Sequence, residues 1–247
     1  MMRHYRYLIF DVDDTLLDFH VAYTNAQKAV AKKLGINYSE KYQVLSEECG
    51  WRAWNESELD HTECLDVQKS YHVRYEQYLK KHYGYLTEML GITADSDDMA
   101  EWHLNSLAST KVPMESDTLQ TYRILAEKYK LAIATNGIER VQKERMSDFL
   151  PYTERIYISE LIGAIKPSKA FYDYVLNDLQ CEPKECLMIG DSIANDIIGA
   201  KSAGMNVCFY NARQKAVPVE MVVDYEIRSM RELIDILLDD MFYRKYT

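Results

Sequence analysis

The chain has 247 residues, of which 47% are hydrophobic and 28% are charged. Such a composition is ordinary for a globular protein of one large or two modest domains. The formal net charge is −10, from 29 basic and 39 acidic residues, and the acidic residues are spread along the chain. This balance argues against a protein that binds a nucleic-acid polymer through its phosphates. An anionic ligand would therefore need a local cationic site.

Sequence patterns also bear on the cellular compartment. The chain has no apolar stretch of the roughly 18 residues that a membrane span needs, and its start is not typical of a signal peptide. We therefore expect a cytoplasmic protein without membrane contact. The five cysteines form no C-x-x-C pair and are odd in number. Reduced thiols are thus favoured over a zinc site or a disulfide framework. No pattern indicates an oligomeric state.

The first part of the chain predicts one strand followed only by helices. The strand is expected over residues 5–10, and helices are expected over 21–34, 42–54, 64–82 and 97–109. Gly35, Gly84 and Gly91 are expected to end three of these helices. This pattern predicts an all-helical insert of nearly a hundred residues.

From Pro113 onward, helix and strand patterns alternate. Helices are expected over 116–129, 138–149, 168–179, 194–203 and 229–240, and strands over 131–134, 155–158, 186–189, 206–210 and 225–227. Apolar strands that alternate with amphipathic helices predict an α/β fold with a doubly wound, Rossmann-like parallel sheet. We expect residues 1–16 and 113–247 to form this core and residues 17–112 to form a helical cap over its ligand-binding edge. The connections near residues 16–18 and 111–113 would be hinges.

Polar side chains follow the ends of the predicted strands, where a doubly wound sheet binds its ligands. In chain order they are Asp11, Asp13, Thr135, Asn136, Lys166, Asp191 and Asp196. Asp11 and Asp191 would repel each other unless a divalent cation lay between them, and Mg²⁺ prefers a few carboxylates together with water and phosphate oxygens. Lys166 and Thr135 offer a positive charge and donors for phosphate. This set suits phosphoryl transfer, with one carboxylate as nucleophile and another moving protons.

Four motifs carry a resemblance to a known family. Residues 11–15 (DVDDT), 134–137 (ATNG), 165–167 (IKP) and 190–196 (GDSIAND) resemble, in this order, the motifs of the haloacid dehalogenase-like hydrolase superfamily, and the insert is similar to its helical cap. The resemblance implies the following roles: nucleophile and Mg²⁺ ligand for Asp11; acid/base and backbone metal ligand for Asp13; metal ligand for Asp191; phosphate binding for Thr135, Asn136 and Lys166; and orientation of Lys166 or a metal-bound water for Asp196.

Longer sequence segments resemble one group of enzymes within this superfamily. Residues 135–146 (TNGIERVQKERM) and 191–205 (DSIANDIIGAKSAGM) are similar to bacterial 5′-nucleotidases that prefer pyrimidine nucleoside monophosphates. The resemblance implies a small phosphorylated metabolite, a nucleotide, as substrate. In the cap, aromatic residues would stack on a base or pack the cap core: Phe19, Trp51, Trp54, Trp102 and the tyrosines. The cap histidines lack metal-ligand spacing and are expected at the surface: His20, His61, His72, His82 and His103.

Three alternatives stay open at this point. A phosphatase of another small metabolite, such as a sugar phosphate, would need the same motifs. A 2-haloacid dehalogenase is disfavoured by Asp13, because a halide leaving group needs no proton. A phospho-receiver module is disfavoured by the chain length and by Asp13, which would speed dephosphorylation. Asp14 stands where the superfamily most often has glycine; with Asp18 it would be solvated or cap a helix, and neither is assigned a catalytic role.

Overall fold

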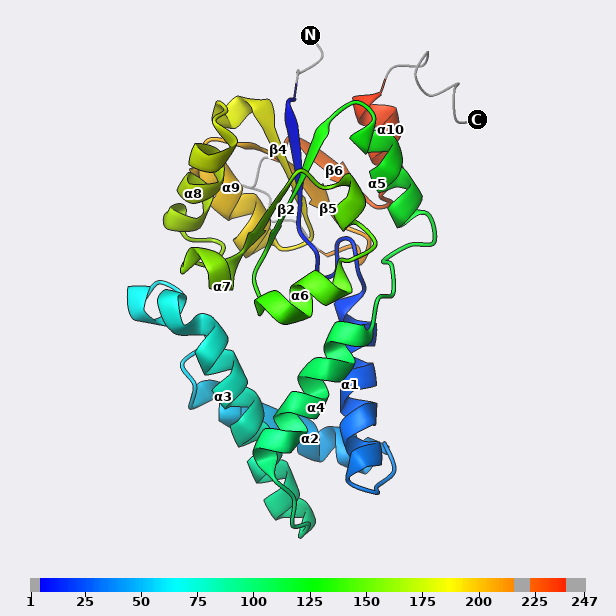
Figure 1. The fold of residues 1–247 in the computed structure, drawn as a ribbon, viewed down its shortest axis with the longest axis vertical. Helices are drawn as coiled ribbons and strands as arrows, with labels where there is room; N and C mark the ends of the chain where they lie inside the picture. Colours follow the sequence, from blue (N-terminus) through cyan, green and yellow to red (C-terminus); the bar gives the residue numbers. More distant parts are fainter. Residues whose placement is uncertain (1–4, 216–222, 239–247) are drawn as a thin grey trace.

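The computed structural model describes residues 5–215 and 223–238. Six strands form one parallel sheet in the order β3, β2, β1, β4, β5, β6. Their bounds are Tyr7–Phe10 for β1, Lys130–Thr135 for β2, Arg155–Ile158 for β3, Cys186–Gly190 for β4, Asn206–Tyr210 for β5 and Tyr225–Ile227 for β6. The strand order runs outward from β1 in both directions (Figure 1). The predicted doubly wound α/β fold is confirmed.

Helices cover both faces of the sheet. On one face lie α5 (Thr118–Ala126) and α10 (Glu232–Leu237), and on the other lie α8 (Lys169–Leu179) and α9 (Gly199–Ser202). Successive residues of β1 point to opposite faces. Leu8 and Phe10 pack in the first apolar cluster, whereas Tyr7 and Ile9 pack in the second. Burial on both faces explains why β1 is apolar throughout.

Four helices lie beyond the carboxyl ends of the strands (Figure 1). They are α1 (Phe19–Lys33), α2 (Glu40–Asn55), α3 (Leu65–Leu90) and α4 (Ser96–Ser109). These helices share an apolar cluster that extends to Ile138 and Val141, at the start of α6 (Glu139–Arg145). The predicted helical insert thus packs on itself and on α6, at the edge of the sheet where a ligand is expected.

Two predicted helix ends fall at Gly84 and at Asp240. Gly84 was expected to end a helix, and this prediction is wrong: α3 continues to Leu90, and Gly91, with φ of +65°, follows it. A glycine inside a helix costs only about 1 kcal/mol, and the burial of Tyr83 and Leu86 in the cap core outweighs that cost. The last helix, expected to reach Asp240, is seen as α10 up to Leu237; residues 239–240 lie outside the described residues.

Three short elements were not predicted. They are α7 (Ser159–Ile162) and the 3₁₀ helices η1 (Leu150–Tyr152) and η2 (Pro183–Glu185). The helix expected over 194–203 is present, but its first part is the π-helix η3 (Ile193–Ile198) and its end is α9. The π-helix follows β4 and carries Asp196. Such π-helical turns occur frequently at functional sites.

The two connections between the sheet and the four helices run side by side. The N–H of Asp18 donates to the carbonyl of Val112 at 2.9 Å, and the N–H of Met114 donates to the carbonyl of Leu16 at 3.0 Å. The segments predicted as hinges therefore form one short paired strip.

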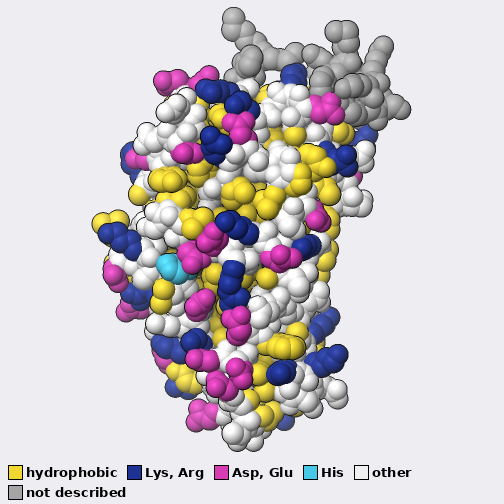
Figure 2. Space-filling view, in the orientation of Figure 1, with side chains coloured by type: hydrophobic (Ala, Val, Ile, Leu, Met, Phe, Trp, Pro, Cys, Tyr) yellow, Lys and Arg dark blue, Asp and Glu magenta, His cyan; other side chains and the backbone are white. Residues whose placement is uncertain are grey.

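Within the part of the chain that the structure describes, every helix is too short or too polar to cross a membrane. Figure 2 shows basic and acidic side chains interspersed on the visible face, rather than a basic patch. All five cysteines are free.

Candidate active site

The predicted residues meet at one edge of the sheet. Asp11 follows β1, and its N–H donates to the carbonyl of Ile189 in β4 at 2.9 Å. Thr135 is the last residue of β2, and Asp191 directly follows β4. Because these neighbouring strands are parallel and in register, their carboxyl ends bring the three side chains to the same edge.

Lys166 joins the carboxylates at this edge. Its Nζ donates to Oδ1 of Asp11 at 2.6 Å, to Oδ1 of Asp196 at 2.7 Å and to the carbonyl of Ala134 at 2.9 Å. The residue is only 2% exposed. Burial alone would lower the pKa of Lys166, but the charges of Asp11 and Asp196 outweigh burial and raise it. Lys166 is therefore a fixed positive charge.

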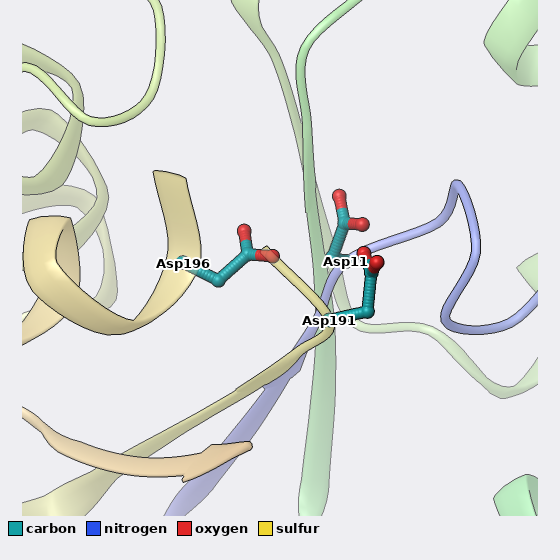
Figure 3. Close-up of side chains that lie close together, drawn as sticks. All are labelled: Asp11, Asp191 and Asp196. Atoms are coloured by element: carbon teal, nitrogen blue, oxygen red, sulfur yellow. The ribbon is translucent and has the colours of Figure 1, made fainter. Parts of the chain in front are cut away.

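Three carboxylates come close enough to share a cation. One oxygen each of Asp11, Asp191 and Asp196 lies within 4.8 Å of the others, and Figure 3 shows the side chains around one space. Asp196, however, already uses both oxygens, since Oδ1 binds Lys166 and Oδ2 accepts from the N–H of Ser192 at 3.0 Å. Asp11 and Asp191 are thus the candidate metal ligands, and Asp196 contacts the ammonium group of Lys166.

The electrostatics of Asp11 and Asp191 fit a divalent cation. Burial raises the pKa of Asp11 well above its ordinary value, although the charge of Lys166 acts in the opposite direction. Burial likewise raises the pKa of Asp191 to about 6, against a hydrogen bond from Lys215. Both shifts reflect the cost of burying negative charge, which a bound cation would offset. Two such carboxylates, with water and phosphate oxygens, suit Mg²⁺.

A single glycine permits this arrangement. A Cβ atom at Gly190 would lie 2.3 Å from Oδ2 of Asp196. Asp196 has no exposed surface and cannot give way to solvent. Only glycine at this position allows Asp196 to approach the end of β4.

Asp13 lies outside the carboxylate cluster and is held by α6. Oδ1 of Asp13 accepts from Nη1 of Arg145, and Oδ2 accepts from Nε2 of Gln142 at 2.9 Å. Nε2 of Gln142 also donates to the hydroxyl of Thr135 at 2.7 Å. Gln142 and Arg145 are fully buried. These two residues fix the carboxylate of Asp13 beside the hydroxyl of Thr135, which we expect to bind phosphate.

Neither Gln142 nor Arg145 is predicted as a site residue from the sequence. The available signal was their spacing of three positions, which places them on one face of a helix. Nothing in the sequence indicated that this face turns toward Asp13, which is 129 positions from Gln142.

Asn136 makes a different contact from the one expected for its side chain. Its Nδ2 donates to the carbonyl of Lys166 at 2.9 Å, and its Oδ1 accepts from the N–H of Lys166 at 2.8 Å. The amide group thus fixes the backbone of Lys166. A contact with phosphate would have to come from the backbone of Asn136.

Asp14 and Asp18 have structural contacts. Asp14 has φ of +59°, which explains why glycine, which adopts positive φ without strain, suits this position. Its Oδ1 accepts from the N–H of Phe19 at 3.1 Å and from Nη2 of Arg213 at 2.8 Å. Asp18 caps α1 by accepting from the N–H of Val21 at 2.8 Å. The helix-capping interpretation of Asp18 is confirmed.

A cavity of about 480 Å³ connects this edge with the four helices. Such a volume is typical of small-molecule sites, which span roughly 300–1,000 Å³. All charged lining residues come from α6, η3 and the segments that follow the strands: Asp11, Asp13, Arg145, Lys166, Asp191 and Asp196. The lining from α1 to α4 is mainly aromatic: Phe19, Tyr23, Trp54, Tyr71, His72, Tyr75, Tyr78, Leu104 and Leu107. The cavity therefore has a charged end and an aromatic end.

The cap aromatic and histidine residues divide between cavity, core and surface. Phe19 and Trp54 line the cavity, whereas Trp51 and Trp102 are exposed at 63% and 44%. The expectation that the cap histidines lie at the surface is wrong for two of them, since His82 and His103 are completely buried. Both bind polar partners among the cap helices, Ser46 and Tyr83 respectively.

Comparison with known proteins gives one family. A family model described as haloacid dehalogenase-like hydrolase matches residues 5–204. The HAD-hydrolase YfnB of Bacillus subtilis (strain 168) is 30% identical over 243 residues, which cover 96% of this chain and 97% of that protein. The pyrimidine 5′-nucleotidase PynA of Streptococcus pneumoniae (strain ATCC BAA-255 / R6) is 28% identical over 236 residues, which cover 94% of this chain and 95% of that protein.

A solved structure agrees over the same length. The orthorhombic crystal form of YfnB, bound to magnesium, matches with a TM-score of 0.79 and 27% identity over 96% of this chain and 100% of that chain. That crystal structure reveals interdomain movement in YfnB.

Proposed function

This chain belongs to the haloacid dehalogenase-like hydrolases, and on that premise we propose that it is a Mg²⁺-dependent phosphomonoester hydrolase. One observation carries the proposal. The buried carboxylate of Asp11 binds Lys166 and faces Asp191, while Asp13, two residues away, lines the same cavity. One space is thus lined by a nucleophile, a fixed positive charge, a metal ligand and a group that moves protons.

The residues divide the reaction into two transfers. An oxygen of Asp11 attacks phosphorus, the ester P–O bond breaks, and protonated Asp13 gives its proton to the leaving alcohol. Asp13 then takes a proton from water, whose oxygen attacks the aspartyl-phosphate and releases phosphate and Asp11. Lys166 neutralises charge on the phosphoryl group and holds Asp11 in place. Bound Mg²⁺, held by Asp11 and Asp191, would supply further positive charge for the phosphate oxygens.

Asp13 separates this reaction from dehalogenation. Arg145 and Gln142 each donate a hydrogen bond to the carboxylate of Asp13 and so position it at the cavity. A halide leaving group needs no acid, so such a positioned second carboxylate has no task in that reaction. We therefore favour phosphate release over chloride release.

We further propose a nucleoside 5′-monophosphate, with a pyrimidine base, as the substrate. The end of the cavity formed by the cap helices is aromatic and carries no carboxylate, lysine or arginine among its lining residues. An uncharged planar base can stack with its whole face on such aromatic walls, whereas a sugar ring is not flat. Similarity to the pyrimidine 5′-nucleotidase PynA supports the same substrate.

The cap is proposed to comprise residues 17–112 and to close over the substrate. Its two connections are hydrogen-bonded to each other, so they can bend together as one hinge. The interdomain movement seen in the YfnB crystal structure supports such a motion. Closure would exclude water while the phosphoryl group is transferred to Asp11.

The test is phosphate release from a panel of nucleotides and sugar phosphates, with Mg²⁺ and with a chelator. We expect release from pyrimidine nucleoside monophosphates that needs Mg²⁺ and is abolished by Asp11→Asn. The matched control is Asp173→Asn, because Asp173 is a half-buried residue of α8, outside the cavity lining, that pairs with Lys169. Near-normal turnover by Asp11→Asn would refute the mechanism, and preferred release from sugar phosphates would refute the substrate class.

A further inference from the structure

Tyr23 ends a chain of hydrogen bonds that runs through the interior of the cap. Nε2 of His82 lies 3.0 Å from the hydroxyl of Ser46, and this hydroxyl lies 3.0 Å from Oε1 of Gln27. Nε2 of Gln27 donates to the hydroxyl oxygen of Tyr23 at 3.0 Å. His82, Ser46 and Gln27 are buried, whereas Tyr23 lines the cavity. The mechanism proposed above uses none of these four residues.

The other nitrogen of His82 fixes the direction of this chain. Nδ1 of His82 is buried and has no partner among the described residues. Burial lowers the pKa of His82 to about 4, so the ring is neutral and carries one N–H. A buried N–H without an acceptor is costly and rare. The proton therefore lies on Nε2, which donates to Ser46.

The rest of the chain follows from that assignment. Since Ser46 accepts from His82, its own hydroxyl proton goes to Oε1 of Gln27. The amide nitrogen of Gln27 then faces Tyr23 and donates to it. The reverse direction would leave an N–H at Nδ1 of His82 without an acceptor.

Tyr23 is thus an acceptor within the cap and a donor toward the cavity. Tyr78 lies on the same wall of the cavity. Burial chiefly, and a hydrogen bond with Tyr23 in addition, raises the pKa of Tyr78. Because Gln27 donates to its oxygen, the hydroxyl of Tyr23 has its own proton to donate. Tyr23 lines the cavity, so an acceptor on a bound molecule can receive that proton.

The surroundings of Tyr23 restrict the acceptor. The ring of Phe19 lies 6.0 Å from that of Tyr23, and the rings of Trp54 and Tyr75 lie 5.4 and 5.5 Å from that of Tyr78, all in the cavity wall. These walls favour a flat, uncharged ring. We propose that Tyr23 donates a hydrogen bond to an exocyclic oxygen of a planar heterocycle in the leaving group. This inference rests on the proposed function and names the residue that recognises the base.

The test uses Tyr23→Phe, which removes the hydroxyl and keeps the ring. Uridine 5′-monophosphate is the probe, and its affinity is measured by calorimetry in an Asp11→Asn background, where turnover does not interfere. We expect Tyr23→Phe to weaken binding about five- to tenfold, as for one hydrogen bond. Tyr38→Phe is the matched control, because Tyr38 is a cap tyrosine outside the cavity.

Analogues with sulfur at position 2 or 4 of the uracil ring locate the accepted oxygen, because sulfur is the weaker acceptor. The protein with Tyr23 should discriminate against one analogue, and Tyr23→Phe should not. Equal affinity of the two proteins for uridine 5′-monophosphate, including no binding by either, overturns the inference. Failure of phosphate release with the affinity difference intact would overturn the proposed reaction and leave the inference standing.

Discussion

The ammonium group of Lys166 lies 2.7 Å from Oδ1 of Asp196, and the two side chains are 3% and 0% exposed. This buried pair is separated by 30 residues and is extended by Asp11, 2.6 Å from the same nitrogen. Lys166 therefore compensates two buried carboxylates at once. Removal of the lysine would leave both of them without their cation.

Lys166→Gln is expected to lower both activity and stability. Loss of one charge that stabilises the phosphoryl group should reduce kcat about 100-fold or more. Breaking a buried ion pair from one side should cost about 3–5 kcal/mol of unfolding free energy. Phosphate release and urea unfolding measure the two effects. Lys169→Gln, a change at the exposed first residue of α8, should alter neither; unchanged stability of Lys166→Gln would contradict the pairing.

Arg145→Gln is expected to act through Asp13. Arg145 contributes Nη1 to the carboxylate of Asp13, which we propose moves protons in both transfers. Loss of this orienting contact should lower kcat about 10- to 100-fold with little change in KM. Arg145→Lys should recover part of kcat, because it keeps a cationic donor. Steady-state kinetics distinguish the cases.

The matched control for Arg145 is Arg155→Gln, a surface residue paired with Asp178. A raised KM with normal kcat in Arg145→Gln would mean that Arg145 contacts the substrate and does not position Asp13.

Some contacts of Asp11 and Asp13 could be predicted from the sequence and others could not. That Asp11, Lys166 and Asp191 meet could be predicted, since each follows a strand and parallel strands end at one edge. That Arg145 binds Asp13 could not be predicted, because it depends on how α6 is rotated about its axis. The same limit applies to His82, whose burial depends on packing among cap helices.

Local rules also failed where tertiary structure outweighed them. Gly84 is a glycine of the kind that often ends a helix, yet α3 continues through it because nearby residues of α3 are buried. That Asp14 replaces the glycine most common at this position could be recognised from the sequence. Its positive φ and its contact with Arg213 are seen only in the structure. The fold class was thus more predictable than the contacts that hold the site.

Gly190→Ala is expected to damage the site. The added Cβ would fall 2.3 Å from the buried carboxylate of Asp196, which must then move away from Lys166. Overpacking of this kind typically costs about 1–3 kcal/mol. We also expect lower kcat, because Lys166 loses one of its two carboxylate partners. Thermal unfolding and phosphate release check both effects.

Gly84→Ala is the matched control for Gly190→Ala. The nearest atom to its added Cβ is 3.9 Å away, and the position lies inside α3. This change should stabilise the protein by about 1 kcal/mol, because alanine favours helix. Similar stability changes in the two variants would show that the close approach of Asp196 has no consequence.

Stability is expected to fall with pH below neutrality because of the buried cap histidines. Burial lowers the pKa of His82 to about 4 and that of His103 to about 3, whereas the unfolded chain has values of about 6.5. Below pH 6.5 the unfolded state binds protons that the native state does not. Their stabilising contribution is therefore complete above pH 6.5. It is lost as the pH falls, toward pH 4 for His82 and toward pH 3 for His103, by about 1.4 kcal/mol per pH unit for each histidine.

Urea unfolding between pH 7.5 and 5 measures this slope. The double variant His82→Gln/His103→Asn keeps a neutral polar atom near Ser46 and Tyr83, because His82 bonds through Nε2 and His103 through Nδ1. Its unfolding free energy should depend less steeply on pH than that of the unaltered protein. His20→Gln, at an exposed position of α1, should leave the slope unchanged. Parallel curves for the double variant and the unaltered protein would mean that carboxylates, and not these histidines, set the pH dependence.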